Sequence, residues 1–130
     1  MGYDTPKQEK IEVNIAYATR QFRRVSHHLD GALLASIPAN PENRRGGILL
    51  AQEGDIWIIT MNSYGGHVPT ELPAFIEYAR TLPAPYIFDV VSQAEPVGEV
   101  RSARFPASVR RHYEYMRRFP ECYLVLGDAI

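Results

Sequence analysis

Residues 47–62 read GILLAQEGDIWIITMN, and this stretch decides the fold. Two apolar arms flank a short connection, Gly54-Asp55, and both arms are rich in β-branched and aromatic side chains. Such side chains favour strands, and a short connection of this kind joins antiparallel neighbours. The stretch therefore predicts a β-hairpin, and with it an antiparallel sheet.

Segments on both sides of the hairpin also have strand patterns. Residues 11–22 alternate between apolar and polar side chains, and residues 31–37 form an apolar segment before a loop rich in Pro, Asn and Gly at 38–46. Downstream, residues 98–106 alternate and predict a returning strand that Pro106 ends. Residues 122–126, CYLVL, are continuously apolar, which is typical of a strand that is covered on both faces.

Helical spacing separates these strand segments. Apolar residues recur at helical intervals over 70–82, and residues 85–95 predict a second short helix that ends before Pro96. A third short helix is predicted within 108–120. The order predicts an α+β fold: one mainly antiparallel sheet with helices packed on one face. We expect a single domain over residues 1–130, with a flexible N-terminal segment at 1–10.

Length and composition limit the class of protein. The chain has 130 residues, 14 basic and 15 acidic side chains and one cysteine. One cysteine excludes an intramolecular disulfide framework and fits a reducing cytoplasm. A net charge of −1 disfavours nucleic acid as a partner, and no apolar run approaches the roughly 20 residues of a membrane span. We therefore expect a soluble, cytoplasmic protein.

Arginine is concentrated near the C-terminus. Six of the 14 Lys and Arg residues lie between Arg101 and Arg118, interleaved with aromatic residues. Such a segment is most simply a solvated surface paired with nearby glutamates, but it also suits an anion or cofactor site. An RNA-contacting surface is a third alternative, which the net charge disfavours.

Two other kinds of chemistry find little support. His27, His28, His67 and His112 do not have the spacing of a metal site, so no metal is expected. Ser63 and His67 lack a nucleophile elbow and an orienting acid, so no catalytic side chain is predicted.

Gly127-Asp128-Ala129 follows the last apolar segment. A carboxylate beyond the carboxyl end of a buried strand, next to a glycine, is a common arrangement for binding a sugar or ribityl hydroxyl. The same three residues also suit a plain turn at the end of a strand. The tripeptide on its own leaves both alternatives open.

The segments together resemble a known family. Residues 11–24 (IEVNIAYATRQFRR), 45–82 and 104–130, above all FPECYLVLGDA at 119–129, are similar to bacterial FAD-dependent monooxygenases of the aromatic-hydroxylase, p-hydroxybenzoate hydroxylase-like type. The resemblance implies the middle, substrate-binding domain of such an enzyme, ending where the chain re-enters the flavin domain. It implies that Gly127 and Asp128 contact FAD in the parent enzyme.

The nucleotide-binding part of that family is missing from the sequence. No G-x-G-x-x-G follows an opening strand, so we expect this chain to be an excised or truncated part that is inactive alone. A missing flavin-binding domain is then an expected partner.

A sheet face bearing Val13, Ile15 and Tyr17, with Trp57 and Ile59 from the hairpin, is predicted as the wall for a small apolar or aromatic substrate; the same pattern equally suits a core. The rival hypothesis is a non-catalytic α+β domain that binds a small apolar ligand or forms a homodimer.

Overall fold

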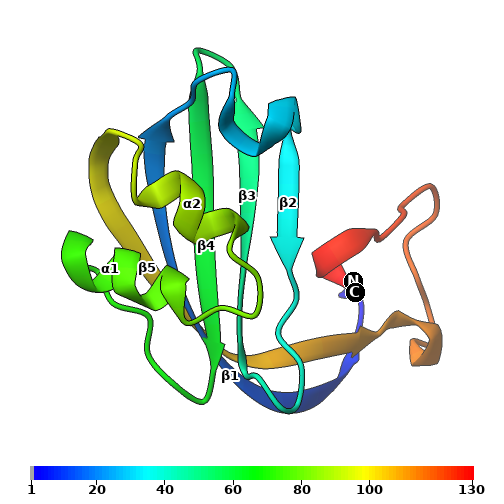
Figure 1. Cartoon of the computed structure of the whole chain (residues 1–130). Coiled ribbons are helices and arrows are strands. Elements are labelled where there is room, and N and C mark those ends of the chain that lie inside the picture. The colour runs from blue at the N-terminus through cyan, green and yellow to red at the C-terminus, as the bar shows by residue number, and fades with distance from the viewer. Residues whose placement is uncertain (1) are drawn as a thin grey trace. The chain divides into compact units, whose positions relative to one another are not determined.

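The computed structural model describes residues 2–130. Within that range the strands form one five-stranded sheet in the order β2-β3-β4-β1-β5 (Figure 1). The elements in chain order are β1 (Lys7–Arg23), η1 (His28–Gly31), β2 (Leu34–Ile37), β3 (Arg45–Gln52), β4 (Ile56–Tyr64), α1 (Leu72–Arg80), α2 (Tyr86–Val91), β5 (Pro96–His112), η2 (Tyr113–Tyr115) and η3 (Gly127–Ala129). The prediction of a mainly antiparallel sheet is confirmed, and the sheet makes up most of the regular structure.

The chain divides into two compact units, where the sequence predicts one domain. Unit 1 comprises residues up to Val13 together with Pro106–Ile130, and unit 2 comprises Asn14–Phe105. The long strands β1 and β5 contribute to both units. Residues 7–10 belong to β1, although the sequence predicts a flexible segment there.

The hairpin predicted from residues 47–62 is confirmed as β3 and β4. Its register pairs Leu50 with Ile58 and Gly47 with Met61. Gly54 and Asp55 both have positive φ angles, 74° and 53°, as the tight connection requires. Glycine and, less readily, aspartate tolerate that backbone region, so the local sequence sets the turn.

The two helices expected at 70–82 and 85–95 form as α1 and α2, each shorter than its pattern. Both pack on the same face of the sheet (Figure 1), where Phe75, Ile87 and Val90 are almost fully buried. The Tyr78 hydroxyl donates a hydrogen bond of 2.9 Å to the main-chain carbonyl of Asn62 in β4. The helices therefore cover one face of the sheet, which we call the covered face.

The covered face holds the core of unit 2. Its sheet residues are Ala16, Ala18 and Phe22 of β1, Ile37 of β2, Leu49 of β3, and Trp57, Ile59 and Met61 of β4. Phe22 stacks on Phe75 of α1 with ring centroids 6.2 Å apart. Burial of each large side chain contributes about 1.5–3 kcal/mol, so this face dominates the stability of unit 2.

A buried histidine is tied to this core. His28 is 7% exposed, and its Nδ1 accepts a hydrogen bond of 3.0 Å from Nε1 of Trp57. Burial lowers the pKa of His28, and the nearby His27 and Arg24 lower it further. A neutral imidazole suits this place because only the neutral ring can accept at Nδ1.

The predicted third helix within 108–120 is wrong. Strand β5 continues through Pro106 to His112, and only the short 3₁₀ turn η2 follows. β5 is an edge strand, so its outer side has no neighbouring strand. Pro106 lacks an N–H, but no hydrogen-bond ladder on that side needs one. Strand pairing thus overrides the local helical pattern.

The predicted strand at 122–126 is also not formed. This segment of unit 1 has no regular structure, and Tyr123, Leu124 and Leu126 are 61%, 77% and 68% exposed. A strand needs a neighbour for its backbone hydrogen bonds, and none of the described residues 2–130 pairs with it. Propensity alone therefore leaves the segment as an exposed apolar coil.

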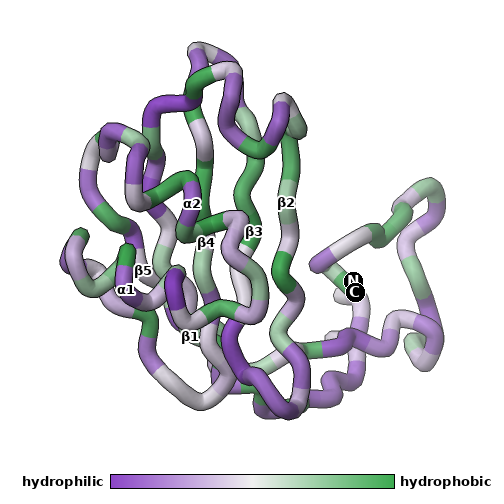
Figure 2. Tube along the Cα trace, in the orientation of Figure 1, coloured by the Kyte–Doolittle hydropathy of each residue, from purple (hydrophilic) through white to green (hydrophobic). Residues whose placement is uncertain are grey.

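Hydropathy differs along the chain. Figure 2 shows hydrophobic residues along β2 and β3, whereas the first part of β1 is largely hydrophilic. None of the helices in residues 2–130 is long and apolar enough to cross a membrane.

Candidate functional site

The sheet of unit 2 has a second face that neither α1 nor α2 covers, which we call the open face. Strand pairing places Thr19, Thr60, Ile48 and Ser36 in one row across four strands. The full set is Ile15, Tyr17, Thr19, Gln21 and Arg23 of β1, Leu34 and Ser36 of β2, Gly46, Ile48, Leu50 and Gln52 of β3, and Ile56, Ile58, Thr60, Asn62 and Tyr64 of β4.

The open face is unusually apolar for a surface without a helix on it. Leu34, Ile48 and Leu50 are 53%, 37% and 42% exposed, and Ile58 is half-buried beside Leu50. The solvated face of an antiparallel sheet normally carries polar side chains. A contiguous apolar patch of this kind is typical of a surface that binds a ligand or a partner.

The open face has few polar groups, among them two threonine hydroxyls and an asparagine amide. The hydroxyls of Thr19 and Thr60 lie 2.8 Å apart in a hydrogen bond between neighbouring strands. The Asn62 Oδ1 atom is buried and has no hydrogen-bond partner within residues 2–130. An apolar surface with few polar groups is the usual composition of a small-molecule site.

Two hollows border the open face. One, of about 290 Å³, is lined by Thr19, Arg20, Gln21 and Ile58 and by Val97, Gly98, Glu99 and Arg101 of β5. The other, of about 310 Å³, is lined by Ala39, Asn40 and Pro41 with the side chains of Arg44 and Tyr64. The second hollow offers an aromatic ring and a guanidinium, which suits a flat ligand that carries a polar group.

The residues predicted as one substrate wall do not share a surface. Trp57 and Ile59 are fully buried on the covered face, whereas Tyr17 lies on the open face, where it pairs with Asn62. Ile15 is 9% exposed, and Val13 belongs to unit 1. The prediction that these residues form one face is therefore wrong, and Trp57 and Ile59 are core residues.

The register of β1 separates Tyr17 from Trp57 and Ile59, which pair with Phe22 and Arg20. β1 also has a local break in its alternation, between Val13 and Ile15. Asn14 has φ of 49°, and Ile15 and Ala16, which follow it, are both buried, although a regular strand alternates. An extra residue in a strand shifts all later side chains to the opposite face. Nothing in the period-2 pattern of residues 11–22 marks this break.

Gly127 and Asp128 lie in the 3₁₀ turn η3 of unit 1. Gly127 has φ of 59°, a conformation that favours glycine, and Asp128 is exposed. The structure thus has a turn at this place without the strand expected before it. Contact of Gly127 and Asp128 with FAD stays a prediction.

The arginine-rich segment is divided between surface pairs and aromatic contacts. Arg110 pairs with Glu114 at 3.2 Å, and Glu114 also accepts from His112 Nδ1 at 2.8 Å. The hydrogen bond from His112 lowers the pKa of the Glu114 carboxyl. Arg118 lies over the ring of Tyr3, 5.8 Å from its centroid. Part of the segment therefore matches the solvated, paired interpretation.

Ser63 and His67 differ in their surroundings. Ser63 is 5% exposed on β4, its hydroxyl lies against Gly66, and His67 is exposed. No group of three or more His, Cys, Asp or Glu side chains in residues 2–130 is placed to hold a metal ion.

Comparison with known proteins shows similarity to a mycobacterial protein. No protein-family model matches the chain. Protein Rv3254 of Mycobacterium tuberculosis (strain ATCC 25618 / H37Rv) is 29% identical over 133 residues, which cover 99% of this chain and 27% of that protein. The chain thus spans about a quarter of the length of this relative, whose name states no activity.

Proposed function

We propose that this chain is the substrate-binding part of an FAD-dependent monooxygenase-like oxidoreductase that works in the cytoplasm. The observation that carries the proposal is the open face: an apolar sheet surface opposite the helices, with a few hydroxyl and amide groups. In the α+β arrangement that we propose, the helices support the sheet and the open face receives the substrate.

The composition of the open face favours a small apolar or aromatic substrate. Leu50, Ile58 and Ile48 offer apolar contact, and the hydroxyls of Thr19 and Thr60 offer hydrogen bonds that orient a polar substituent. FAD would supply the oxygen-activating chemistry, and the side chains of this chain would bind and orient the substrate and exclude water. We assign no acid, base or nucleophile to the chain.

The exposed segment at 122–126 supports a flavin-domain partner. Its apolar side chains, Leu124 and Leu126 above all, would be buried by a neighbouring parallel strand. In that arrangement Gly127 and Asp128 would follow the end of a buried strand, where a carboxylate can accept from the hydroxyls of the flavin's ribityl group. The FAD site, the substrate and the monooxygenase activity of the whole protein are all part of the proposal.

The experiment that tests the proposal maps aromatic probes onto the chain. We expect 4-hydroxybenzoate or indole to shift the backbone amide signals of β1, β3 and β4 in a saturable way in ¹H–¹⁵N spectra. Leu50→Ser should weaken binding several-fold, because it removes apolar contact. Val25→Ser is the matched control, since Val25 is also 42% exposed but lies in the turn after β1.

The result that contradicts the proposal is equally specific. The open face would not be the substrate site if the probes shifted none of its amide signals, or if they bound Leu50→Ser as tightly as the unchanged chain. FAD should show no micromolar binding to this chain, since no glycine-rich phosphate loop is in its sequence. Tight FAD binding would instead indicate an autonomous flavin site.

A second candidate function, self-association, rests on the edge of the sheet. β2 is an edge strand; its first residue, Leu34, is 53% exposed, and Leu33 just before it is 59% exposed. An apolar edge strand can pair with the same strand of a second copy of the chain, so that each copy covers the edge of the other. Sedimentation at micromolar and millimolar chain concentration would show a dimer that Leu34→Lys abolishes, whereas a monomer at both concentrations excludes this candidate.

A further inference from the structure

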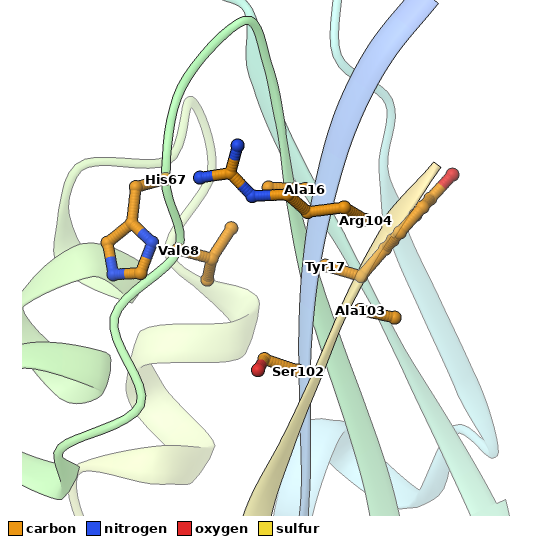
Figure 3. A pocket seen from close by; sticks show the side chains of 7 residues that line it. All are labelled: Ala16, Tyr17, His67, Val68, Ser102, Ala103 and Arg104. Carbon is orange, nitrogen blue, oxygen red and sulfur yellow. The ribbon is translucent and has the colours of Figure 1, made fainter. Parts of the chain in front are cut away.

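A cavity of about 280 Å³ opens beside the covered face, at the end of the sheet where β4 leads into α1. It is lined by Ala16 and Tyr17 of β1, His67 and Val68 of the loop after β4, and Ser102, Ala103 and Arg104 of β5. Figure 3 shows Ser102, Arg104 and His67 on one side of β1 and β5, with Tyr17 and Ala103 pointing away on the other. The polar and basic side chains of the lining thus lie on the cavity side of the strands, together with the apolar Ala16 and Val68.

Small side chains create this space. Ala16 and Ala18 occupy this end of β1, whereas Phe22 fills the other end of the same face. Val68 is 1% exposed and forms an apolar wall beneath His67. Gly65, with φ of 70°, lets the chain turn after β4 and brings the loop beside β5.

The cavity has basic and hydroxyl groups and no carboxylate in its lining. The Arg104 guanidinium extends past Ala16 towards the side on which His67 lies (Figure 3). Within residues 2–130, Arg104 forms no ion pair, whereas Arg24, Arg80 and Arg110 each lie within 4 Å of an Asp or Glu carboxylate. Arg104 therefore offers a positive charge with no carboxylate of residues 2–130 within 4 Å of it.

We propose that this cavity binds the oxygens of a small anion, the carboxylate or phosphoryl group of a metabolite. Arg104 donates two parallel hydrogen bonds to the anion, and the Ser102 hydroxyl and a His67 ring N–H donate further bonds. Val68 and the Ala16 methyl group contact the apolar remainder of the ligand. His67 and Arg104 are exposed, so the anion enters without opening the fold.

The anion site is separate from the proposed function. Ser102 and Arg104 lie on the opposite side of the strands from Tyr17, which belongs to the open face. Binding of an aromatic probe to the open face and binding of an anion to this cavity can therefore be measured separately, and one can fail while the other holds.

The test uses inorganic phosphate and benzoate as separate probes on the full chain, with chloride at equal ionic strength as the salt control. We expect saturable shifts of the amide signals of His67, Val68 and Ser102–Arg104 with at least one probe. The probe that binds with the higher affinity shows whether the site prefers a phosphoryl group or a carboxylate. Arg104→Gln should weaken binding at least tenfold, because hydrogen bonds to charged groups are the strong ones.

Arg101→Gln is the matched control. Arg101 is an exposed arginine of the same strand that lines a hollow of the open face instead. The substitution Arg101→Gln should change the affinity for the anion less than twofold. His67→Asn is a second variant of the site itself and should weaken binding. Shifts that chloride reproduces, saturation by neither probe, or equal losses in Arg104→Gln and Arg101→Gln would each overturn the proposal.

Discussion

Replacement of His28 by alanine tests whether the buried Trp57–His28 hydrogen bond stabilises unit 2. The Trp57 side chain is fully buried and donates to His28 Nδ1 at 3.0 Å. Without the imidazole, the indole N–H has no acceptor and cannot reach water. An unsatisfied buried donor costs about 1–3 kcal/mol. We expect the free energy of unfolding to fall by that amount.

The assay is urea unfolding followed by tryptophan fluorescence, since Trp57 is the single tryptophan of the chain. With a urea slope of about 2 kcal/mol per molar, the loss lowers the midpoint by roughly 0.5–1.5 M. His28→Asn should recover at least half of the loss, because its amide oxygen can replace Nδ1 as the acceptor. His27→Ala is the control, because His27 is exposed and adjacent.

The pH dependence of stability tests the same contact in another way. Because burial lowers the pKa of His28 in the folded chain, the unfolded chain binds a proton more readily. Stability contributed by neutral His28 is complete above its unfolded pKa of about 6.5 and is lost as pH falls towards the lowered folded pKa. His28→Asn should show a smaller fall between these two values. The reasoning is refuted if His28→Ala matches His27→Ala in stability, or if His28→Asn keeps the full pH dependence.

Three further substitutions test the fold of unit 2 by the same unfolding assay. Gly46→Ala should destabilise by about 1–3 kcal/mol, since a Cβ there would lie 2.5 Å from the carbonyl oxygen of Ile37; an unchanged midpoint would contradict this close approach. Tyr78→Phe should cost about 0.5–1.5 kcal/mol through loss of its bond to Asn62, and a neutral effect would mean that this bond contributes nothing. Ile59→Ala should cost about 2–5 kcal/mol as a core residue, and a loss below 1 kcal/mol would argue for a pocket residue instead.

The hairpin and the two α-helices could be predicted because their signals are local. Gly54 and Asp55 supply the positive φ angles of the turn, and the apolar spacing over 70–82 places Phe75 and Ala79 on one side of α1. Each signal acts within a few residues and needs little help from the rest of the chain. These elements accordingly appear close to their expected positions.

The C-terminal part could not be predicted because its signals depend on neighbours. Residues 108–112 resemble a helix in pattern, yet they extend β5. Residues 122–126 have the composition of a buried strand, yet they lie exposed without a neighbouring strand in residues 2–130. Strand formation requires a partner backbone, and the sequence of the strand does not say whether one is present.

The candidate site shows the same division between local and tertiary information. The sequence by itself determined which strands and helices form in unit 2, and it supplied the apolar residues for two sheet faces. Only the tertiary structure decided that Trp57 and Ile59 face the helices, that Tyr17 lies on the open face, and that His67 meets Arg104 at one cavity. A period of two gives both faces of a strand the same signal, so the face that becomes core is set by strand register and by where the helices pack.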